Sequence, residues 1–287
     1  MAITGLEFFL IRMRELAVMK EPLSENDKIK EYWDERAAGS SAIAVTTNDN
    51  YLRILEAETI AKVIQELELP DALRVFDVGC GDGQTTIRVA ETLKAATFLG
   101  ADYSPAMVAR AVANLADNAD VSKRVEFREG DILNLVACSG AEHFDVATTD
   151  RCIINLPTFE EQRQAIHNIA QYLKPGGYYL ALENFTDGQE MLNQTRALIG
   201  LPEISVRWHN RFLTEQELDE IASPHFDILR ILNFSSTYYY ITRVVYSALC
   251  RDLGEEPDYQ HPIHKVAMTL PSEGNYSPTR MAILRRK

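Results

Sequence analysis

The chain has 287 residues, of which 46% are hydrophobic and 25% are charged, a composition typical of globular proteins. Its 29 Lys and Arg residues are outnumbered by 42 Asp and Glu residues, which gives a formal net charge of −13. This composition excludes disorder or a fibrous repeat as the main architecture. The acidic balance also lacks the basic surface that duplex nucleic acid or an anionic membrane selects, so we expect no nucleic-acid partner.

The cysteines and the first residues bear on the cellular compartment. Four cysteines without C-x-x-C spacing, in a chain long enough to fold without disulfides, favour a reducing, cytoplasmic compartment; they are Cys80, Cys138, Cys152 and Cys250. The apolar segment 5–11 is interrupted by Glu7 and lacks the preceding positive charge of a signal peptide. Its spacing predicts an amphipathic helix over 5–20, with binding to a membrane surface as an alternative. We expect this helix to pack on its own domain or on a partner subunit, which leaves a homodimer open. No segment has the length of a membrane-spanning helix.

The first 70 residues are predicted to be helical, and the rest alternates between strands and helices. Helices are expected over 25–38 and 49–68, with a loop of small residues at 39–42 between them. Strands are then expected at 74–78, 96–101, 124–128, 143–148 and 178–184, and helices at 84–94, 104–116 and 158–172. Strands separated by helices of this length predict right-handed crossovers and a largely parallel sheet.

The C-terminal third departs from this alternation. Strands are expected at 226–234 and 280–284, separated by a helical stretch at 238–250 and a proline-rich loop. An insert of this length, over 236–275, suggests a lid or a pocket wall. We therefore predict an α/β fold, a Rossmann-like doubly wound sheet of about seven strands, mostly parallel with one antiparallel strand near the C-terminus. The expected division is an N-terminal helical cap over 1–70 and one domain over 71–287.

A glycine-rich segment, Asp77–Gly83, follows the first strand directly and opens the next helix. Glycine permits positive φ angles and lets a ligand approach the backbone closely. In open α/β sheets, ligands bind at the carboxyl ends of the strands. The spacing is G-x-G-x-G, which differs from the G-x-G-x-x-G that binds a pyrophosphate. A tight turn without a ligand is the alternative.

Acidic residues follow the next two strands. Asp102 ends the second strand, where a carboxylate can accept hydrogen bonds from both hydroxyls of a ribose. Asp131 follows the third strand and can accept one from an adenine amino group. Each acid alone is also compatible with a helix cap or an exposed strand end. Their shared position on successive strand ends favours a nucleoside-binding edge.

Four motifs in this order resemble the class I S-adenosylmethionine-dependent methyltransferases over about residues 70–185. They are Asp77–Gly83, Gly100–Met107, Gly130–Ile132 and Leu173–Gly177, the last of which has the composition of a helix stop signal. The resemblance implies S-adenosylmethionine as the cofactor. It places Gly79, Gly81 and Gly83 against the methionine part, Asp102 on the ribose, Met107 on the adenine and Asp131 at the adenine edge. The implied cofactor-binding set is Asp77, Gly79, Cys80, Gly81, Gly83, Asp102, Tyr103, Met107, Asp131 and Ile132.

The acceptor side is expected in the segments around this core. Candidate bases are Asp150 after the fourth strand, Glu183 at the end of the fifth, and His209 in a polar-aromatic segment. Candidate acceptor-binding residues are Arg151, Asn210, Arg211, Tyr239 and Arg243. The alternative for Asp150 and Arg151 is a local ion pair, and the alternative for His209 is a structural histidine. Tyr239 and Arg243 are also compatible with a buried helix face. His261 and His264 lack a third ligand at a known spacing, so we expect no metal.

These observations predict an enzyme that methylates a polar small molecule, a sugar or an anionic metabolite, at oxygen or nitrogen. The arginines and tyrosines favour such acceptors because guanidinium groups bind phosphate or carboxylate and aromatic rings stack on sugars. An NAD-dependent oxidoreductase on a Rossmann fold is one alternative. A cofactor-binding module without catalytic activity is another.

Overall fold

The computed structural model describes residues 23–39, 45–67, 69–70, 72–134 and 143–287. The helix expected over 5–20 and most of the loop at 39–42 lie outside the described residues. Among the helices that are described, none is both long and apolar enough to cross a membrane.

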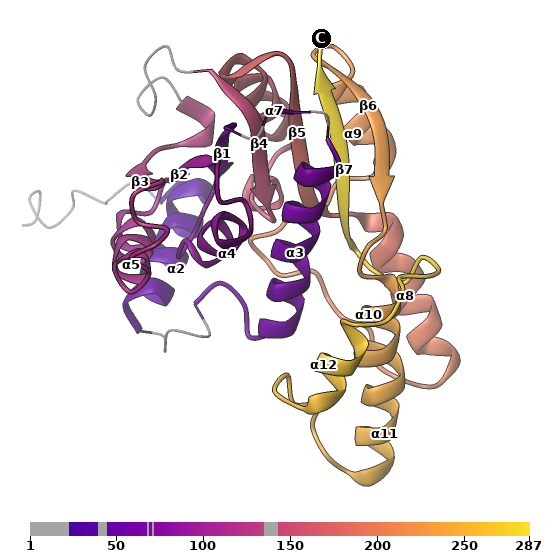
Figure 1. Ribbon diagram of the computed structural model, residues 1–287. Coiled ribbons are helices and arrows are strands. Elements are labelled where there is room, and N and C mark those ends of the chain that lie inside the picture. The colour runs from indigo at the N-terminus through magenta and orange to yellow at the C-terminus, as the bar shows by residue number, and fades with distance from the viewer. Residues whose placement is uncertain (1–22, 40–44, 68, 71, 135–142) are drawn as a thin grey trace, which may run out of the picture.

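A seven-stranded sheet in the order β3-β2-β1-β4-β5-β7-β6 forms the centre of the structure (Figure 1). The strands are β1 (Arg74–Val78), β2 (Thr97–Asp102), β3 (Val125–Glu129), β4 (Phe144–Asp150), β5 (Leu173–Asn184), β6 (Phe226–Leu232) and β7 (Thr279–Arg286). The first five are parallel, whereas β7 pairs antiparallel with both β5 and β6. The strand order reverses at β1, and the predicted doubly wound, mostly parallel sheet is confirmed.

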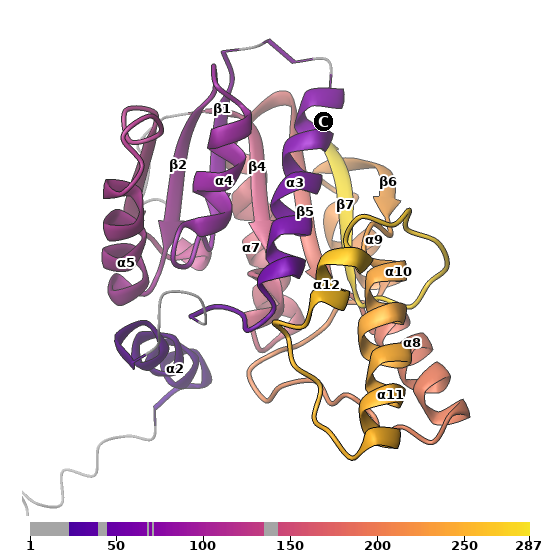
Figure 2. The ribbon, with the colours of Figure 1, turned by 60° about the horizontal axis from the view of Figure 1, so that its bottom comes forward.

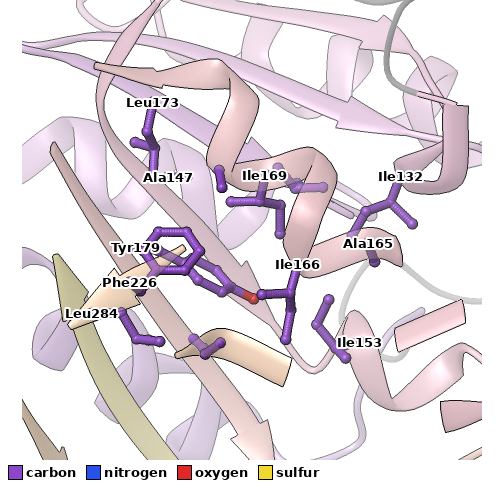
Figure 3. Packing of buried hydrophobic residues seen from close by; sticks show 14 of the residues in the cluster. Ile132, Ala147, Ile153, Ala165, Ile166, Ile169, Leu173, Tyr179, Phe226 and Leu284 are labelled. Atoms are coloured by element: carbon purple, nitrogen blue, oxygen red, sulfur yellow. The ribbon is translucent and has the colours of Figure 1, made fainter. Parts of the chain in front are cut away.

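Helices cover both faces of the sheet, as Figures 1 and 2 show. One face packs against α3 (Asn50–Glu66), α4 (Gln84–Thr92) and α5 (Pro105–Ala116), and the other against α7 (Phe159–Tyr172) and α9 (Glu215–Ala222). Figure 3 shows the core on the face covered by α7 and α9, where Ala165, Ile166 and Ile169 of α7 pack with Tyr179 of β5 and Phe226 of β6. Burial of each large apolar side chain contributes about 1.5–3 kcal/mol, so this core stabilises the packing of α7 against the sheet.

The remaining helices lie beyond the carboxyl ends of the parallel strands. They are α2 (Glu25–Gly39), α8 (Thr186–Leu198), α10 (Ser236–Tyr239), α11 (Tyr246–Leu253) and α12 (Pro262–Ala267), with a π-helical segment η3 (Tyr240–Val245) and 3-10 turns η1 (Ile132–Asn134) and η2 (Ile153–Asn155). In Figure 2, α2 lies below α5, and the α10–α12 insert lies below α3 and β7. The sheet therefore presents its ligand-binding edge to these additional helices.

Local signals placed most element boundaries within a few residues. Asp49 caps α3 by accepting a hydrogen bond from the N–H of Leu52, and Ser104 caps α5 by accepting one from Met107. Side-chain caps of this kind satisfy N–H groups that have no partner inside the helix.

One predicted boundary was wrong, and one helical stretch has an unexpected hydrogen-bonding pattern. The segment before the fifth strand, expected as a separate turn, lies inside β5, where the pairing with β4 skips between Phe144 and Val146. Gly176 in this segment has a φ of 76°. The helical stretch expected over 238–250 is present as α10, η3 and α11, of which η3 has π-helical turns.

Candidate active site

A cavity of about 420 Å³ lies at the carboxyl edge of the sheet. Its walls come from the ends of β1, β2 and β4, from α2, from the segment before α3, from the connection between α8 and α9, and from the insert. Strand ends contribute one side and the additional helices the other. The volume is in the range of small-molecule binding sites.

The glycine-rich segment forms one wall of the cavity, and its three glycines differ in role. All three have positive φ angles, and Gly79 and Gly81 line the cavity. A Cβ atom on Gly81 would meet only a methyl group of Thr46, at 3.0 Å, whereas one on Gly79 would lie 2.2 Å from the sulfur of Cys152. The absence of a side chain at Gly81 therefore leaves room in the cavity beside the backbone. The absence of one at Gly79 allows the ends of β1 and β4 to approach each other.

Asp102 stands beside this loop and lines the cavity. Its Oδ2 accepts a hydrogen bond from the Gly81 N–H at 2.8 Å, and its Oδ1 accepts one from the Ser104 N–H at 2.9 Å. Burial raises the pKa of Asp102 to about 6. The neighbouring Tyr103 also lines the cavity, and its buried hydroxyl has no hydrogen-bond partner among the described residues. An unpartnered hydroxyl here is suited to a ligand's polar group.

Other predicted cofactor residues complete this end of the cavity. Met107 is buried at 2% exposure, Asp131 directly precedes η1, and Ile132 is its first residue. All three line the cavity.

Three residues of the implied cofactor set do not line the cavity. Asp77 is buried behind the loop, where it accepts hydrogen bonds from the hydroxyls of Thr86 and Thr148, and burial raises its pKa to about 6. Cys80 packs in the core, and Gly83 has no room for a side chain because Phe127 lies 2.6 Å from the position of a Cβ atom. These residues shape the glycine-rich segment from behind, which corrects their expected place at the ligand.

The end of β4 brings Asp150 and Arg151 to the cavity. Arg151 pairs with buried Glu56 at 2.8 Å and with Asp150 at 3.3 Å, and the Thr85 hydroxyl donates to Asp150. Burial raises the pKa of Glu56, and the charge of Arg151 opposes this. The ion pair considered as an alternative to ligand binding is thus present, yet both members also face the cavity.

Two further predictions are corrected by the structure. Glu183 is 1% exposed and does not line the cavity, whereas its neighbour Asn184 does, because successive strand residues point to opposite faces. Arg211 is also outside the cavity lining. It pairs with Glu217 at 2.5 Å and donates to Gln162 at 2.7 Å, which fixes it against α7 and α9.

His209 lines the cavity at 4% exposure. Its ring packs among Tyr32, Trp33 and Trp208, with ring centroids 4.5, 5.5 and 5.3 Å away. Burial, with the charge of Arg207, lowers the pKa of His209 to about 4, so the imidazole is neutral at physiological pH. Its Nδ1 has no hydrogen-bond partner within the described part of the chain. Asn210 lines the cavity beside it.

The insert supplies Tyr239 and Arg243 to the opposite wall. Arg243 bonds to Asp49 and to the Thr242 hydroxyl, and its guanidinium lies 5.3 Å from the ring centre of Tyr239 and 4.8 Å from that of Tyr259. Although burial opposes it, the charge of Arg243 holds the pKa of Asp49 below its ordinary value. Tyr239 is the last residue of α10, and Arg243 lies in η3.

Sequence reasoning missed several residues of the cavity wall. They include Asn26, Trp33, Thr46, Asn48, Asp49 and Tyr259. Asp49 was expected only as the start of a helix. An N-cap signal does not reveal that the same carboxylate also faces a cavity and an arginine 194 positions further along the chain.

Residues 75–177 match a family model described as a methyltransferase domain. Over these residues the chain is a methyltransferase domain of the class I S-adenosylmethionine-dependent family. The cofactor of this family is S-adenosylmethionine, and the match covers the glycine-rich segment, both strand-end acids and the end of β4. It favours this assignment over the NAD-dependent oxidoreductase considered above.

The curated relatives of this methyltransferase differ in their named acceptors. A demethylmenaquinone methyltransferase of Desulfitobacterium hafniense is 29% identical over 42% of this chain and 46% of the relative. A trans-aconitate 2-methyltransferase of Deinococcus radiodurans is 33% identical over 45% of each chain. The matches therefore span just under half of each relative's length.

Solved structures support the fold of the methyltransferase. The magnesium protoporphyrin IX methyltransferase of Synechocystis PCC 6803, solved with bound SAH, superposes with a TM-score of 0.56 at 16% identity, covering 91% of this chain and 96% of that chain. The cyclase SpnF superposes with a TM-score of 0.53 at 24% identity, covering 80% of each chain. Because a cyclase shares the fold, the fold alone does not decide the reaction.

Proposed function

We propose that this protein transfers a methyl group from S-adenosylmethionine to a polar small molecule, a sugar or an anionic metabolite, at oxygen or nitrogen. The observation that carries the proposal is a charged and hydrogen-bonding wall, which lines the same cavity as the glycine-rich segment. This wall comprises Asp49, Asp150, Arg151, Asn184, Gln189, His209, Asn210, Tyr239, Arg243 and Tyr259.

The cofactor end of the proposed site is the edge formed by β1 and β2. Bound S-adenosylmethionine supplies an electrophilic methyl group on a positively charged sulfur. Gly79 and Gly81 would lie against its methionine part, Asp102 would accept from the ribose hydroxyls, and Met107 would pack on the adenine. The open face of Gly81 and the unpartnered Tyr103 hydroxyl fit such a ligand.

The acceptor is proposed to bind between the β4 end and the insert. An arginine has five N–H donors, so the bonds of Arg243 to Asp49 and Thr242 orient its guanidinium and leave donors for a ligand. Arg151 is oriented in the same way by Glu56 and Asp150. Tyrosine rings beside these groups suit a sugar or a flat polar molecule. Because the relatives differ in acceptor, the class is argued from this wall and not from their names.

A methyl-transfer assay tests the acceptor class. The panel contains sugars, phosphorylated metabolites, polycarboxylates, amines and hydrophobic phenols, each with labelled S-adenosylmethionine. We expect turnover of a polar acceptor, and Arg243→Ala should raise its KM about 10- to 100-fold because a charge-assisted hydrogen bond is lost. Arg211→Ala, an ion-paired arginine outside the cavity, is the matched control and should leave KM unchanged. Preferred turnover of neutral hydrophobic phenols, with Arg243→Ala behaving as wild type, would reject the acceptor class. A panel without any turnover in the presence of bound cofactor would favour the non-catalytic alternative.

We propose that His209 is the general base that takes a proton from the molecule being methylated, or that it accepts a hydrogen bond from that molecule. His209 lines the cavity, and the Nδ1 of its neutral imidazole has no hydrogen-bond partner in the described part of the chain, whereas the carboxylate of Asp150 already accepts from Arg151 and Thr85. His209→Phe keeps a ring among the three aromatic neighbours and should lower kcat about 10- to 100-fold, the low end for general bases because a pKa of about 4 makes a weak base. The titration of His209 itself should contribute no change in kcat between pH 5 and 8. Its protonation should reduce kcat only near pH 4. Wild-type kcat in His209→Phe would remove His209 from the reaction.

The N-terminal cap and the insert are proposed to close over the site. Trp33 of α2 and Arg243 of the insert line the same cavity, and Trp33 donates to Asn155 at 3.3 Å, beside the β4 end. We expect hydrogen exchange to slow in Glu25–Gly39 and in the insert 236–275 when S-adenosylhomocysteine and an acceptor bind, with β6 as the unchanged control. Unchanged exchange in both segments would contradict closure.

A further inference from the structure

The segment that follows β4 has an unusual backbone. Arg151 has a φ of 55°, which makes it the one non-glycine residue with positive φ among the described residues. The left-handed conformation costs an L-residue free energy, so surrounding contacts must hold it. The 3-10 turn η2 follows at once, and residues of this segment line the cavity; they are Asp150, Arg151, Cys152, Ile154, Asn155 and Leu156.

The carboxylate of Glu183 accepts hydrogen bonds from three successive N–H groups of this turn. Its Oε1 accepts hydrogen bonds from the N–H groups of Cys152 at 3.2 Å and Ile153 at 3.0 Å, and its Oε2 accepts one from Ile154 at 3.3 Å. Such N–H groups at the start of a helical turn have no partner inside the turn. Here one buried side chain serves three of them in succession.

Other contacts fix the ends of the segment and leave its middle to Glu183. The Arg151 N–H donates to the Leu182 carbonyl at 2.7 Å, and the Asn155 side chain donates to the Arg151 carbonyl at 2.7 Å. On the far side, the Arg211 N–H donates to the Ile154 carbonyl at 2.7 Å. The donors of Cys152, Ile153 and Ile154 are thus bound by Glu183, and the carbonyls of Ile153 and Ile154 accept from Gln162 and Arg211 on other elements.

We propose that Glu183 is a positioning residue which, when ionised, holds the segment after β4 in the shape that presents Arg151 and Asn155 to the methyl acceptor. The part about the acceptor rests on the proposed function. The backbone role does not. A protonated or amide side chain places a donor against one of the three N–H groups, so the segment should loosen when Glu183 loses its charge.

The surroundings make this loss of charge accessible near neutral pH. Burial raises the pKa of Glu183 to about 7, while its backbone hydrogen bonds oppose the increase. The groups that face it are Thr149, Asp150, Cys152, Tyr179 and its cross-strand neighbour Arg280, which itself pairs with Glu215. The three N–H bonds lower the pKa of Glu183, so a loosened segment over a still buried carboxyl has the higher pKa and is favoured by protonation. The segment should therefore be held above pH 7 and released progressively below it.

Amide hydrogen exchange of the free protein tests the backbone role. Protection of the amides of 152–154, corrected for intrinsic exchange rates, should fall about tenfold in wild type between pH 8 and pH 6, as expected for a group titrating in this range. Glu183→Gln should have the lower protection at every pH. Glu126→Gln, which removes an acid paired with Arg128 on β3, is the control and should leave these amides unchanged. Constant protection of wild type across this range, or wild-type protection in Glu183→Gln, would overturn the proposal. The wild-type measurement needs no variant, so misfolding of Glu183→Gln does not prevent the test.

Two further measurements separate this role from general destabilisation and from the proposed function. Calorimetry with S-adenosylhomocysteine should give Glu183→Gln an affinity within about threefold of wild type, because the glycine-rich segment and Asp102 lie on other strands; a loss of more than tenfold would indicate general damage and count against the proposal. With an acceptor from the panel, kcat of wild type should fall below pH 7 and that of Glu183→Gln should be low and independent of pH there. A pH profile that is the same in both would overturn the positioning role. A panel without any turnover would reject the proposed function, and the exchange result would still decide the backbone role.

Discussion

Replacing Gly79 with alanine is expected to abolish cofactor binding. Gly79 has a φ of 74°, and a Cβ atom there would lie 2.2 Å from the sulfur and 2.7 Å from the Cβ of Cys152. The left-handed conformation and the overpacked contact together should cost about 2–5 kcal/mol. Either the β1 and β4 ends separate or the glycine-rich segment changes shape. Calorimetric titration with S-adenosylhomocysteine should then show no binding.

Two controls separate the contact from backbone strain. Gly254 has nearly the same φ, 73°, but a Cβ atom there has nothing within 4 Å, so Gly254→Ala measures strain alone and should bind the ligand normally. Adding Cys152→Gly to Gly79→Ala removes the contacted sulfur and Cβ and should restore part of the affinity. Normal binding by Gly79→Ala, or no recovery in the double variant, would show that the approach of these two strand ends does not control the cofactor site.

The sequence predicted the fold well because local patterns determine most of it. Alternating apolar segments located the parallel strands, and caps such as Asp49 and Ser104 located helix starts. The π-helical turn at Tyr240–Val245 was not predictable in this way, since its hydrogen-bonding pattern is not distinguished by apolar spacing. Arg243, which lies within this turn, lines the cavity.

The site was predicted less completely because a strand end does not fix where a side chain points. Asp102 and Glu183 both end parallel strands, yet only Asp102 lines the cavity. The alternation of side chains along β5 sends Glu183 to the side of the η2 turn and Asn184 to the cavity. Residues such as Trp33 and Tyr259 reach the cavity through tertiary packing over long sequence distances, for which a single sequence gives no local signal.

Asp102→Ala is expected to weaken binding of S-adenosylhomocysteine by about 2–4 kcal/mol, or about 30- to 1,000-fold, since charge-assisted hydrogen bonds are lost. Each carboxylate oxygen accepts one backbone N–H, from Gly81 or Ser104, and retains capacity for a further donor from a ribose. The substitution removes the proposed ribose contacts and also the support of the Gly81 N–H. Asp102→Asn keeps the shape and one acceptor oxygen, so its loss should be smaller. Calorimetry gives both values.

The pH dependence of cofactor binding distinguishes Asp102 from Asp77, a second buried acid at this edge of the sheet. Burial raises the pKa of both Asp102 and Asp77 to about 6, so each becomes protonated as the pH falls from 7 to 5. Protonation of Asp102 removes acceptor capacity in the cavity, and affinity for S-adenosylhomocysteine should therefore decrease with falling pH through about 6. Asp77 faces Thr86 and Thr148 behind the loop and does not line the cavity. If Asp102 is the ribose acceptor, Asp102→Asn should bind with an affinity that is nearly constant over this range, whereas Asp77→Asn should keep the decrease. An Asp102→Asn variant that loses affinity on acidification as steeply as wild type would place the titrating group elsewhere and remove Asp102 from the proposed contact.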